Sequence, residues 1–75
     1  MTRKGSSGRL ANEIRMLRLK HGDMTQQALA DRVGVTRQTV IAMEQNRYSP
    51  SLETAFRIAE AFGVGLEEVF QYRKD

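Results

Sequence analysis

The stretch "ALADRVGVTRQTVIAM", residues 28–43, decides the fold. Ala30 is small enough for two helices to approach closely, and Gly34 tolerates the positive φ that a tight turn between them requires. Thr36 can cap the following helix, because its hydroxyl can accept from the backbone amide of Gln38 or Thr39. The spacing therefore predicts two short helices that cross steeply through a tight turn, a helix-turn-helix.

The helices of this motif divide their residues between a core and an outer face. Leu29 and Val33 share a face of the first helix, and the second helix turns Val40 and Met43 inward. The outward face of the second helix mixes hydrogen-bond donors with apolar side chains, at Arg37, Gln38, Ile41 and Ala42. The purpose of this mixed face is the question that the rest of the chain must answer.

The segments on either side of the motif predict three more helices. In "RLANEIRMLRLK", residues 9–20, apolar residues recur at i, i+4 and i+7, at Leu10, Ile14 and Leu17. Pro50 and Ser51 announce a helix at residues 52–62, whose rhythm is carried by Leu52, Ala55, Phe56, Ala59 and Phe62. A last short helix is expected in "LEEVFQY", residues 66–72, with acidic residues in its first turn.

The chain shows no signal for a β-sheet. It contains no run of strict period-two alternation and no Asn-Gly hairpin turn. Connections of only a few residues imply that consecutive helices pack against one another. We therefore expect a compact all-α domain of five helices at residues 9–72, with a flexible basic arm or expression remnant at residues 1–8 and a tail at residues 73–75.

Length and composition exclude several functional classes. The chain of 75 residues suffices for one small domain, and with no cysteine and one histidine it offers no disulfide, metal site or His-based catalytic pair. No nucleophile elbow or P-loop occurs, so we expect no catalytic residue, no enzyme activity and no cofactor. No apolar run approaches the roughly 18 residues of a membrane span, and a secretory signal is lacking, which predicts a cytoplasmic protein without a membrane partner.

Charge is distributed unevenly along the chain. Residues 1–50 carry nine Lys/Arg against four Asp/Glu, a balance of +5, whereas residues 51–75 carry three against five, a balance of −2. The first half therefore suits a polyanionic partner. On charge alone, an ordinary solvated basic surface is an equal alternative, because a net +3 is usual for a small domain.

The ordered set of signals over nearly the whole of residues 9–72 resembles a known family. The segment "MTQQALADRVGVTRQTVIAMEQNRYSPSLETAFRIAEAFGVGLEEVF", including its "PSLETAFRIA" and "FGVGLEEVF", is similar to the Cro/C1-type (XRE-family) helix-turn-helix regulators, especially the short stand-alone members. The resemblance implies a lambda-repressor-like DNA-binding domain. In such domains the second helix of the motif lies in the major groove of double-stranded DNA.

The resemblance assigns base contacts to the first turns of that helix, at Thr36, Arg37, Gln38, Ile41 and Ala42. Arg37 can donate to guanine O6 and N7, Gln38 can pair with adenine N6 and N7, and Ile41 or Ala42 can pack on a thymine methyl group. Alternatives remain open for each. Arg37 and Gln38 could be solvated helix residues. Ile41 could pack on another chain or on the amino-terminal arm, and Ala42 could serve only to permit close approach.

Phosphate contacts are implied for residues on both sides of that helix: Thr25, Gln26, Gln27, Thr39, Asn46, Arg47 and Tyr48. Gln26 begins the supporting helix, whose amino-terminal dipole favours a phosphate. The chain departs from the family after the second helix, where the commoner Asn-Gly is Gln45-Asn46. Asparagine tolerates the left-handed conformation, so we expect the helix end to survive the change. Plain solvation is the alternative for Arg47, and a ring that covers the core is the alternative for Tyr48.

The family also pairs an arginine of its first helix with a glutamate late in the second helix of the motif. These positions correspond to Arg18 and Glu44. If the pair is buried, it fixes the orientation of the helices more than it adds net stability.

Specific binding by so small a domain implies a second copy. One recognition helix reads only a few base pairs, so a homodimer is expected from energetics as well as from the resemblance. The expected dimer surface is the apolar carboxy-terminal part: Ile58, Phe62, Leu66, Val69, Phe70 and Tyr72. The alternative is that these residues close the core of the monomer.

The sequence thus predicts a dimeric, sequence-specific transcriptional regulator that binds a palindromic operator. Repression by blocking RNA polymerase is the expected mode, and activation by contact with RNA polymerase is the alternative. A rival of another class is a protein-interaction module, such as the antitoxin of a toxin-antitoxin pair, which would bind its partner through the carboxy-terminal face.

Overall fold

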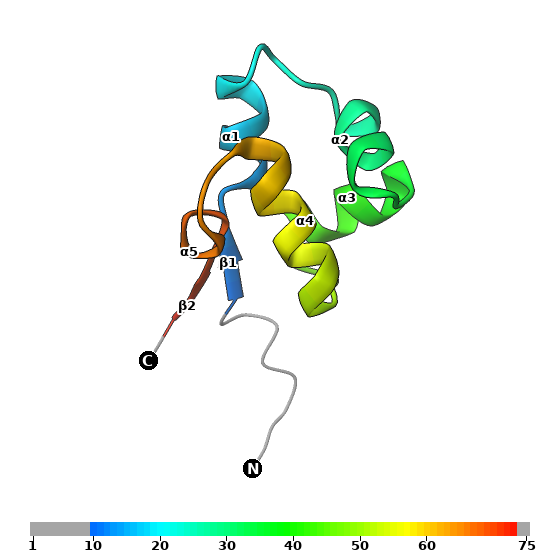
Figure 1. The fold of residues 1–75 in the computed structure, drawn as a ribbon. Helices are drawn as coiled ribbons and strands as arrows, with labels where there is room; N and C mark the ends of the chain where they lie inside the picture. Colours follow the sequence, from blue (N-terminus) through cyan, green and yellow to red (C-terminus); the bar gives the residue numbers. More distant parts are fainter. Residues whose placement is uncertain (1–9, 74–75) are drawn as a thin grey trace.

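The computed structural model describes residues 10–73, so the predicted arm at residues 1–8 and the end of the predicted tail lie outside the described residues. The elements follow in the order β1 (Leu10–Asn12), α1 (Ile14–Lys20), α2 (Gln26–Val33), α3 (Arg37–Glu44), α4 (Leu52–Phe62), α5 (Leu66–Val69) and β2 (Phe70–Tyr72). In Figure 1, α2 and α3 lie together at one side, α4 runs through the middle, and α5 with the two strands lies at the opposite side. The five helices expected from the sequence are present.

A two-stranded antiparallel sheet joins the beginning and the end of the described chain, which corrects the expectation that no sheet forms. The register pairs Leu10 with Tyr72, Ala11 with Gln71 and Asn12 with Phe70. The expected first helix therefore begins at Ile14 instead of residue 9, and the expected last helix ends at Val69 instead of residue 72. Strands of three residues are too short to display a period of two, so no local pattern indicated them.

Helices α2 and α3 form the expected helix-turn-helix, and each begins at a threonine cap. The Thr25 hydroxyl accepts from the backbone N–H of Ala28 at 3.0 Å, and the Thr36 hydroxyl accepts from that of Thr39 at 3.1 Å. Gly34 ends α2 with a φ of 79°, where a side chain would be strained. The turn between the helices is therefore short and rigid.

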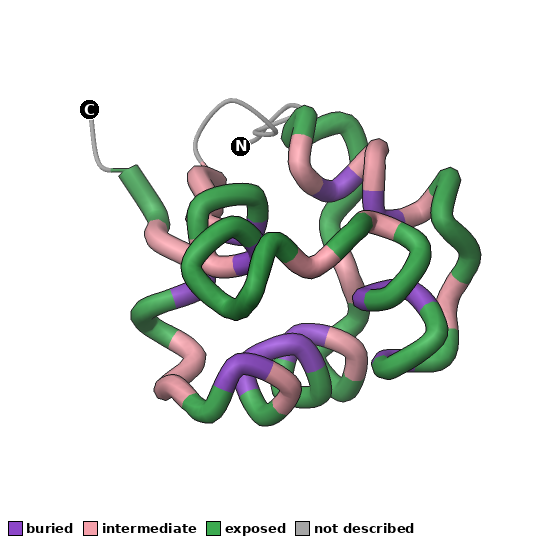
Figure 2. The backbone as a smooth tube through the Cα atoms, turned by 90° about the horizontal axis from the view of Figure 1, so that it is seen from above, coloured by how far each residue is buried: buried purple, intermediate pink, exposed green. Residues whose placement is uncertain are grey.

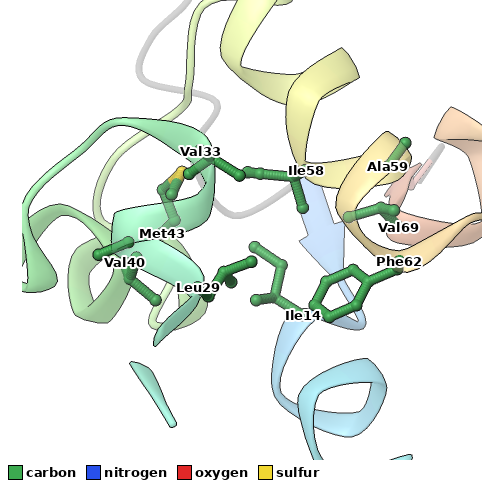
Figure 3. Packing of buried hydrophobic residues seen from close by; sticks show 10 residues of the cluster. Ile14, Leu29, Val33, Val40, Met43, Ile58, Ala59, Phe62 and Val69 are labelled. Atoms are coloured by element: carbon green, nitrogen blue, oxygen red, sulfur yellow. The ribbon is translucent and has the colours of Figure 1, made fainter. Parts of the chain in front are cut away.

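One hydrophobic core holds α3 in place. Its buried side chains come from all five helices, with Ile14, Leu29, Val33, Val40, Met43, Ile58, Phe62 and Val69 among them. Figure 3 shows Val40 and Met43 of α3 at one end of this core and Phe62 and Val69 at the other. Buried positions alternate with exposed ones along each helix (Figure 2), as expected for amphipathic helices. Because α3 turns its apolar side inward, its opposite side faces solvent.

The inward face of α4 differs from the expected one. Ala55, Ala59 and Phe62 are buried as expected, but Leu52 and Phe56 are 68% and 54% exposed. The two exposed side chains are four positions apart and so lie on one side of the helix, which no other described element covers. The helical rhythm identified the apolar positions but not the side that packs.

Candidate nucleic-acid interface

The exposed side of α3 carries the residues for which base contacts were expected. Thr36, Arg37 and Gln38 are exposed, whereas Ile41 and Ala42 are half-buried. The side chains of Arg37 and Gln38 form no hydrogen bond within residues 10–73. All their donors are therefore available to an outside partner.

Thr36 differs from these two residues because its hydroxyl is already bonded. It accepts from the backbone N–H of Thr39 and lies 3.0 Å from the Thr39 hydroxyl. Both hydroxyls therefore serve the first turn of α3. This cap fixes the position from which Arg37 and Gln38 project.

A buried ion pair ties α1 to the end of α3. Nε of Arg18 donates to Oε2 of Glu44 at 2.6 Å, and Nη2 of Arg18 donates to Oε1 at 3.2 Å. Arg18 is 8% exposed, and its Nη1 donates to the backbone carbonyl of Met24 at 2.9 Å. The structure thus brings together the two side chains that the sequence paired, in the bidentate geometry that fixes orientation best.

Glu44 also holds the first residue of α2. Nε2 of Gln26 donates to Oε1 of Glu44 at 3.1 Å, so the side chain expected to contact phosphate is positioned by the ion pair. One of the two N–H groups on Nε2 remains after this bond. Of its neighbours, Thr25 caps α2, and Gln27 donates to Oδ1 of Asp31 at 2.9 Å.

The loop after α3 has the geometry that an asparagine at position 46 permits. Asn46 has a φ of 59°, and its N–H donates to the carbonyl of Met43 at 3.0 Å. The N–H of Arg47 donates to the carbonyl of Ala42 at 2.9 Å, which completes a Schellman motif. The change from the commoner glycine therefore preserves the helix end, as expected.

The remaining phosphate candidates of this loop are exposed. Nε of Arg47 donates to the side-chain carbonyl of Gln45 at 2.9 Å, which leaves its other guanidinium donors free to bond elsewhere. Tyr48 is half exposed, so its ring only partly covers the protein. Both residues follow the last residue of α3, Glu44, within four positions.

Asn12 of β1 also contacts the end of α3, and sequence reasoning missed it. Its Nδ2 donates to the carbonyl of Met43 at 3.0 Å and to Oδ1 of Asn46 at 2.9 Å. Its Oδ1 accepts from the backbone N–H of Ile14 at 3.0 Å. An asparagine shortly before a helix often accepts from the backbone N–H two residues on, as in an Asx-turn, which is the signal that could have identified this contact.

The six residues expected at a dimer surface divide into two groups. Ile58, Phe62 and Val69 are at most 3% exposed within the monomer, which corrects their assignment to a surface. They are buried because α4 and α5 turn these side chains toward α1 and α2. Leu66 and Phe70 are half-buried and Tyr72 is 63% exposed, so these three remain accessible.

An apolar groove lies beside the accessible residues. It has a volume of about 310 Å³ and is lined by Leu10, Pro50, Leu52, Ala55, Leu66 and Phe70. These residues come from β1, the loop before α4, the first turns of α4, α5 and β2. None of these six lining residues is charged.

The described part of the chain offers nothing typical of a metal site or a membrane span. Residues 10–73 contain no group of three or more His, Cys, Asp or Glu side chains placed to hold a metal ion. None of the helices in this range is long and apolar enough to cross a bilayer.

Comparisons with known proteins agree with the arrangement of α2 and α3. A family model described as helix-turn-helix matches residues 14–69. An uncharacterised HTH-type transcriptional regulator of Methanocaldococcus jannaschii is 46% identical over 66 residues, which cover 88% of this chain and 98% of the relative. Another, of Methanothermobacter thermautotrophicus, is 57% identical over 53 residues, which cover 69% of this chain and 77% of the relative.

A phage protein and a solved structure are also similar. The cryptic phage CTXphi transcriptional repressor RstR of Vibrio cholerae is 36% identical over 59 residues, which cover 79% of this chain and 52% of the repressor. The crystal structure of a candidate DNA-binding protein from Bacteroides fragilis superposes with a TM-score of 0.71. That superposition covers 83% of this chain and 98% of the other at 24% sequence identity, and so shows the shared fold.

Proposed function

The chain belongs to the helix-turn-helix family of DNA-binding transcriptional regulators, in its short Cro/C1-type form, and on that premise we propose that it acts as a dimeric repressor. Each subunit places α3 in the major groove of a palindromic operator. The partner is double-stranded DNA, which would keep the protein in the cytoplasm, and the domain binds without catalysing a reaction.

The observation that carries this proposal is that the start of α3 exposes polar side chains without hydrogen-bond partners in the described part of the chain. Arg37 and Gln38 lie at its exposed start without a bonding partner among residues 10–73. The guanidinium donors of Arg37 match guanine O6 and N7. The side-chain amide of Gln38 can donate to adenine N7 and accept from the N6 amino group, and all these groups are presented in the major groove. Thr36, Ile41 and Ala42 complete the proposed base-reading surface, with an apolar contact to a thymine methyl group at Ile41 or Ala42.

The surroundings of α3 support a grip on the DNA backbone. On one side, Gln26 keeps one free N–H at the start of α2, where the helix dipole favours a phosphate. On the other side, Arg47 and Asn46 lie in the loop after α3. We assign weaker phosphate contacts to Thr25, Gln27, Thr39 and Tyr48.

The apolar groove supports a dimer formed with a second copy of the chain. Leu52, which lines the groove, is 68% exposed, and Phe56 and Tyr72 are also more than half exposed, so apolar side chains are available to a partner. A two-fold interface uses the same surface on both subunits and makes the operator a palindrome, with half-sites about 34 Å apart or a multiple of that. Repression is supported by the similarity to RstR, which is named a transcriptional repressor.

Selection of bound sequences from a random duplex library tests the proposal, because it reports binding, symmetry and half-site spacing together. We expect a palindromic consensus. Gln38→Ala should then cost roughly 1–3 kcal/mol on the selected operator and relax the preference at one base pair. Arg47→Ala should weaken all duplexes alike and lower the salt slope by about one. Identical behaviour of the two variants would contradict the assigned roles.

The same groove favours one rival, a module that binds another protein such as a toxin. The two functions differ in oligomeric state and in DNA preference. Light scattering at tens of micromolar should show a dimer, and Phe56→Ala with Tyr72→Ala should shift it toward the monomer. A monomer that binds random and selected duplexes equally, with little dependence on salt, would support the rival instead.

A further inference from the structure

Asn12 has every hydrogen-bonding group of its side-chain amide occupied. Its Oδ1 accepts from the N–H of Ile14, and its Nδ2 donates both to the carbonyl of Met43 and to Oδ1 of Asn46. The three distances lie between 2.9 and 3.0 Å. Asn12 thus connects the first turn of α1 with the loop after α3, 34 positions later in the chain.

The orientation of the Asn12 amide is determined by its neighbours. A backbone carbonyl can only accept and a backbone N–H can only donate, so the atom facing Met43 must be Nδ2 and the atom facing Ile14 must be Oδ1. An amide flip would place like groups against each other at both contacts. The orientation of Asn12 in turn determines that of Asn46, which must present its Oδ1 to the Nδ2 of Asn12.

The consequence is that the NH₂ group of Asn46 faces away from Asn12. This group forms no hydrogen bond within residues 10–73, and Asn46 is exposed. We propose that Asn12 is a positioning residue for DNA binding, which keeps the side-chain NH₂ of Asn46 directed outward as a donor to a backbone phosphate. This inference rests on the proposed function of the α3 surface and names a residue that acts on it from β1.

Two features of the loop make such orientation necessary. Asn46 is already in the left-handed conformation, with a φ of 59°, so its backbone position is fixed by the Schellman motif. Its terminal amide can still rotate by half a turn, and the reversed amide would present a carbonyl oxygen to the phosphate. An acceptor facing a phosphate repels it, whereas an NH₂ group attracts it. The two bonds of Asn12 therefore decide the sign of this contact.

A double-mutant cycle between positions 12 and 46 tests the proposal on the full chain. Asn12→Ala should weaken binding to an unrelated 20-base-pair duplex and to a selected operator by the same factor, roughly threefold to tenfold. Asn46→Gly removes the amide and suits the left-handed conformation, so it serves as the background. In that background Asn12→Ala should change the affinity by less than about twofold, because the residue through which it acts is gone. An equal loss in both backgrounds would overturn the proposal and make Asn12 a structural residue only.

A second variant covers the case in which Asn12→Ala folds poorly. Asn12→Asp keeps the acceptor for the N–H of Ile14, but its carboxylate can only accept from Asn46 and so favours the reversed amide. The substitution should therefore weaken binding more with Asn46 present than with glycine at that position. The effect of the added charge is common to both backgrounds and cancels in the cycle. Losses that match in the two backgrounds would reject the proposal.

Side-chain amide NMR of the wild-type protein gives an independent measurement. The Nδ2H₂ resonances of Asn46 should shift when the 20-base-pair duplex is added, while those of Asn12 stay nearly unchanged. Failure of the wild-type chain to bind any duplex would reject both this inference and the proposed function. Binding with no shift at Asn46, or with an additive cycle, would reject the inference alone.

Discussion

The helix-turn-helix and the terminal unit, by which we mean β1, α5 and β2, are specified by different kinds of signal. In the helix-turn-helix, each boundary is set by a residue next to it, such as Thr25, Gly34 and Thr36. In the terminal unit, each three-residue strand depends on a partner about sixty positions away, and α5 has four residues without a capping hydroxyl. Local signals therefore allow the first region to be predicted from the sequence, whereas in the second they predict the start of α5 but not the two strands.

The regions also differ in what their polar groups do. Around α3, buried or half-buried polar side chains form a connected network through Arg18, Glu44 and Gln26. The terminal unit instead contributes Leu10, Leu66 and Phe70 to the apolar groove and exposes Tyr72, next to the exposed carboxylates Glu67 and Glu68. The first arrangement specifies one orientation of α3, and the second leaves apolar side chains accessible at the surface.

The largest expected effect comes from removing the carboxylate of the network. Glu44→Ala leaves the guanidinium of Arg18 buried without its partner, which should lower the free energy of unfolding by roughly 3–5 kcal/mol. Urea unfolding followed by circular dichroism measures it. Since a small domain has a margin of about 5 kcal/mol, the variant should retain at most about 2 kcal/mol, and between a few per cent and about half of it should be unfolded at 25 °C.

A matched control exists on the outer side of α4. Arg57 and Glu53 form an ion pair of nearly the same length, 2.7 Å, with side chains that are 53% and 75% exposed. Glu53→Ala should cost less than about 1 kcal/mol, because solvent screens this pair. Similar losses for Glu44→Ala and Glu53→Ala would show that the network around α3 does not hold the helix-turn-helix together.

A smaller difference is expected between the opening free energies of backbone amides in the two regions, which hydrogen exchange measures within one molecule. Two-stranded sheets are only marginally stable, so the amides of β1 and β2 should open more often than those of α2 and α3. We expect a difference of roughly 1–3 kcal/mol in opening free energy. Measurement at low protein concentration separates this from dimer formation, which should protect β2 as the concentration rises. Equal protection of both regions in the monomer would show that the strands are as stable locally as α2 and α3.

The smallest effects concern the caps. Thr36→Ala should lower stability by about 1 kcal/mol, whereas Thr36→Ser, which keeps the hydroxyl, should cost far less. In the terminal unit, Glu68 accepts from the N–H of Gly65 at 3.2 Å at an exposed site, and Glu68→Ala should cost only about 0.5 kcal/mol. Thermal unfolding of the three variants measures the order of these stability losses. A larger loss for Glu68→Ala than for Thr36→Ala would contradict the view that local caps specify the helix-turn-helix.

Much of the fold could be predicted because helix starts and stops are local. Thr36 caps the helix that it was expected to cap, and α4 begins directly after Ser51, where a helix start was expected. Gly34 and Gly63 each end a helix with a positive φ. The strands could not be predicted, since the Leu10–Tyr72 pairing exists only once the helices between them have packed. The exposure of Leu52 and Phe56 was missed for a related reason: periodicity identifies an apolar side of a helix, not the neighbour that covers it.

The candidate site shows the same division. The exposure of Arg37 and Gln38 could be predicted, because Val40 and Met43 are buried and so determine which side of α3 faces solvent. The side-chain orientations of Gln26 and Asn46 depend on Glu44 and Asn12, which belong to elements far away in the sequence. Residue types could be read from the sequence, but the direction of each side-chain amide required the folded structure.

The sheet also has a consequence for the order in which the protein folds during synthesis. β1 leaves the ribosome early, but its partner β2 follows about sixty residues later, several seconds at ordinary rates of translation. Helices α2 and α3 can form their local contacts during that interval, since their caps and turn are complete by residue 47. In the nascent chain the helix-turn-helix would then be largely formed before β1, with Asn12 at its end, can pair with β2. Full closure of the domain would be a late event, reached only after Tyr72 has emerged.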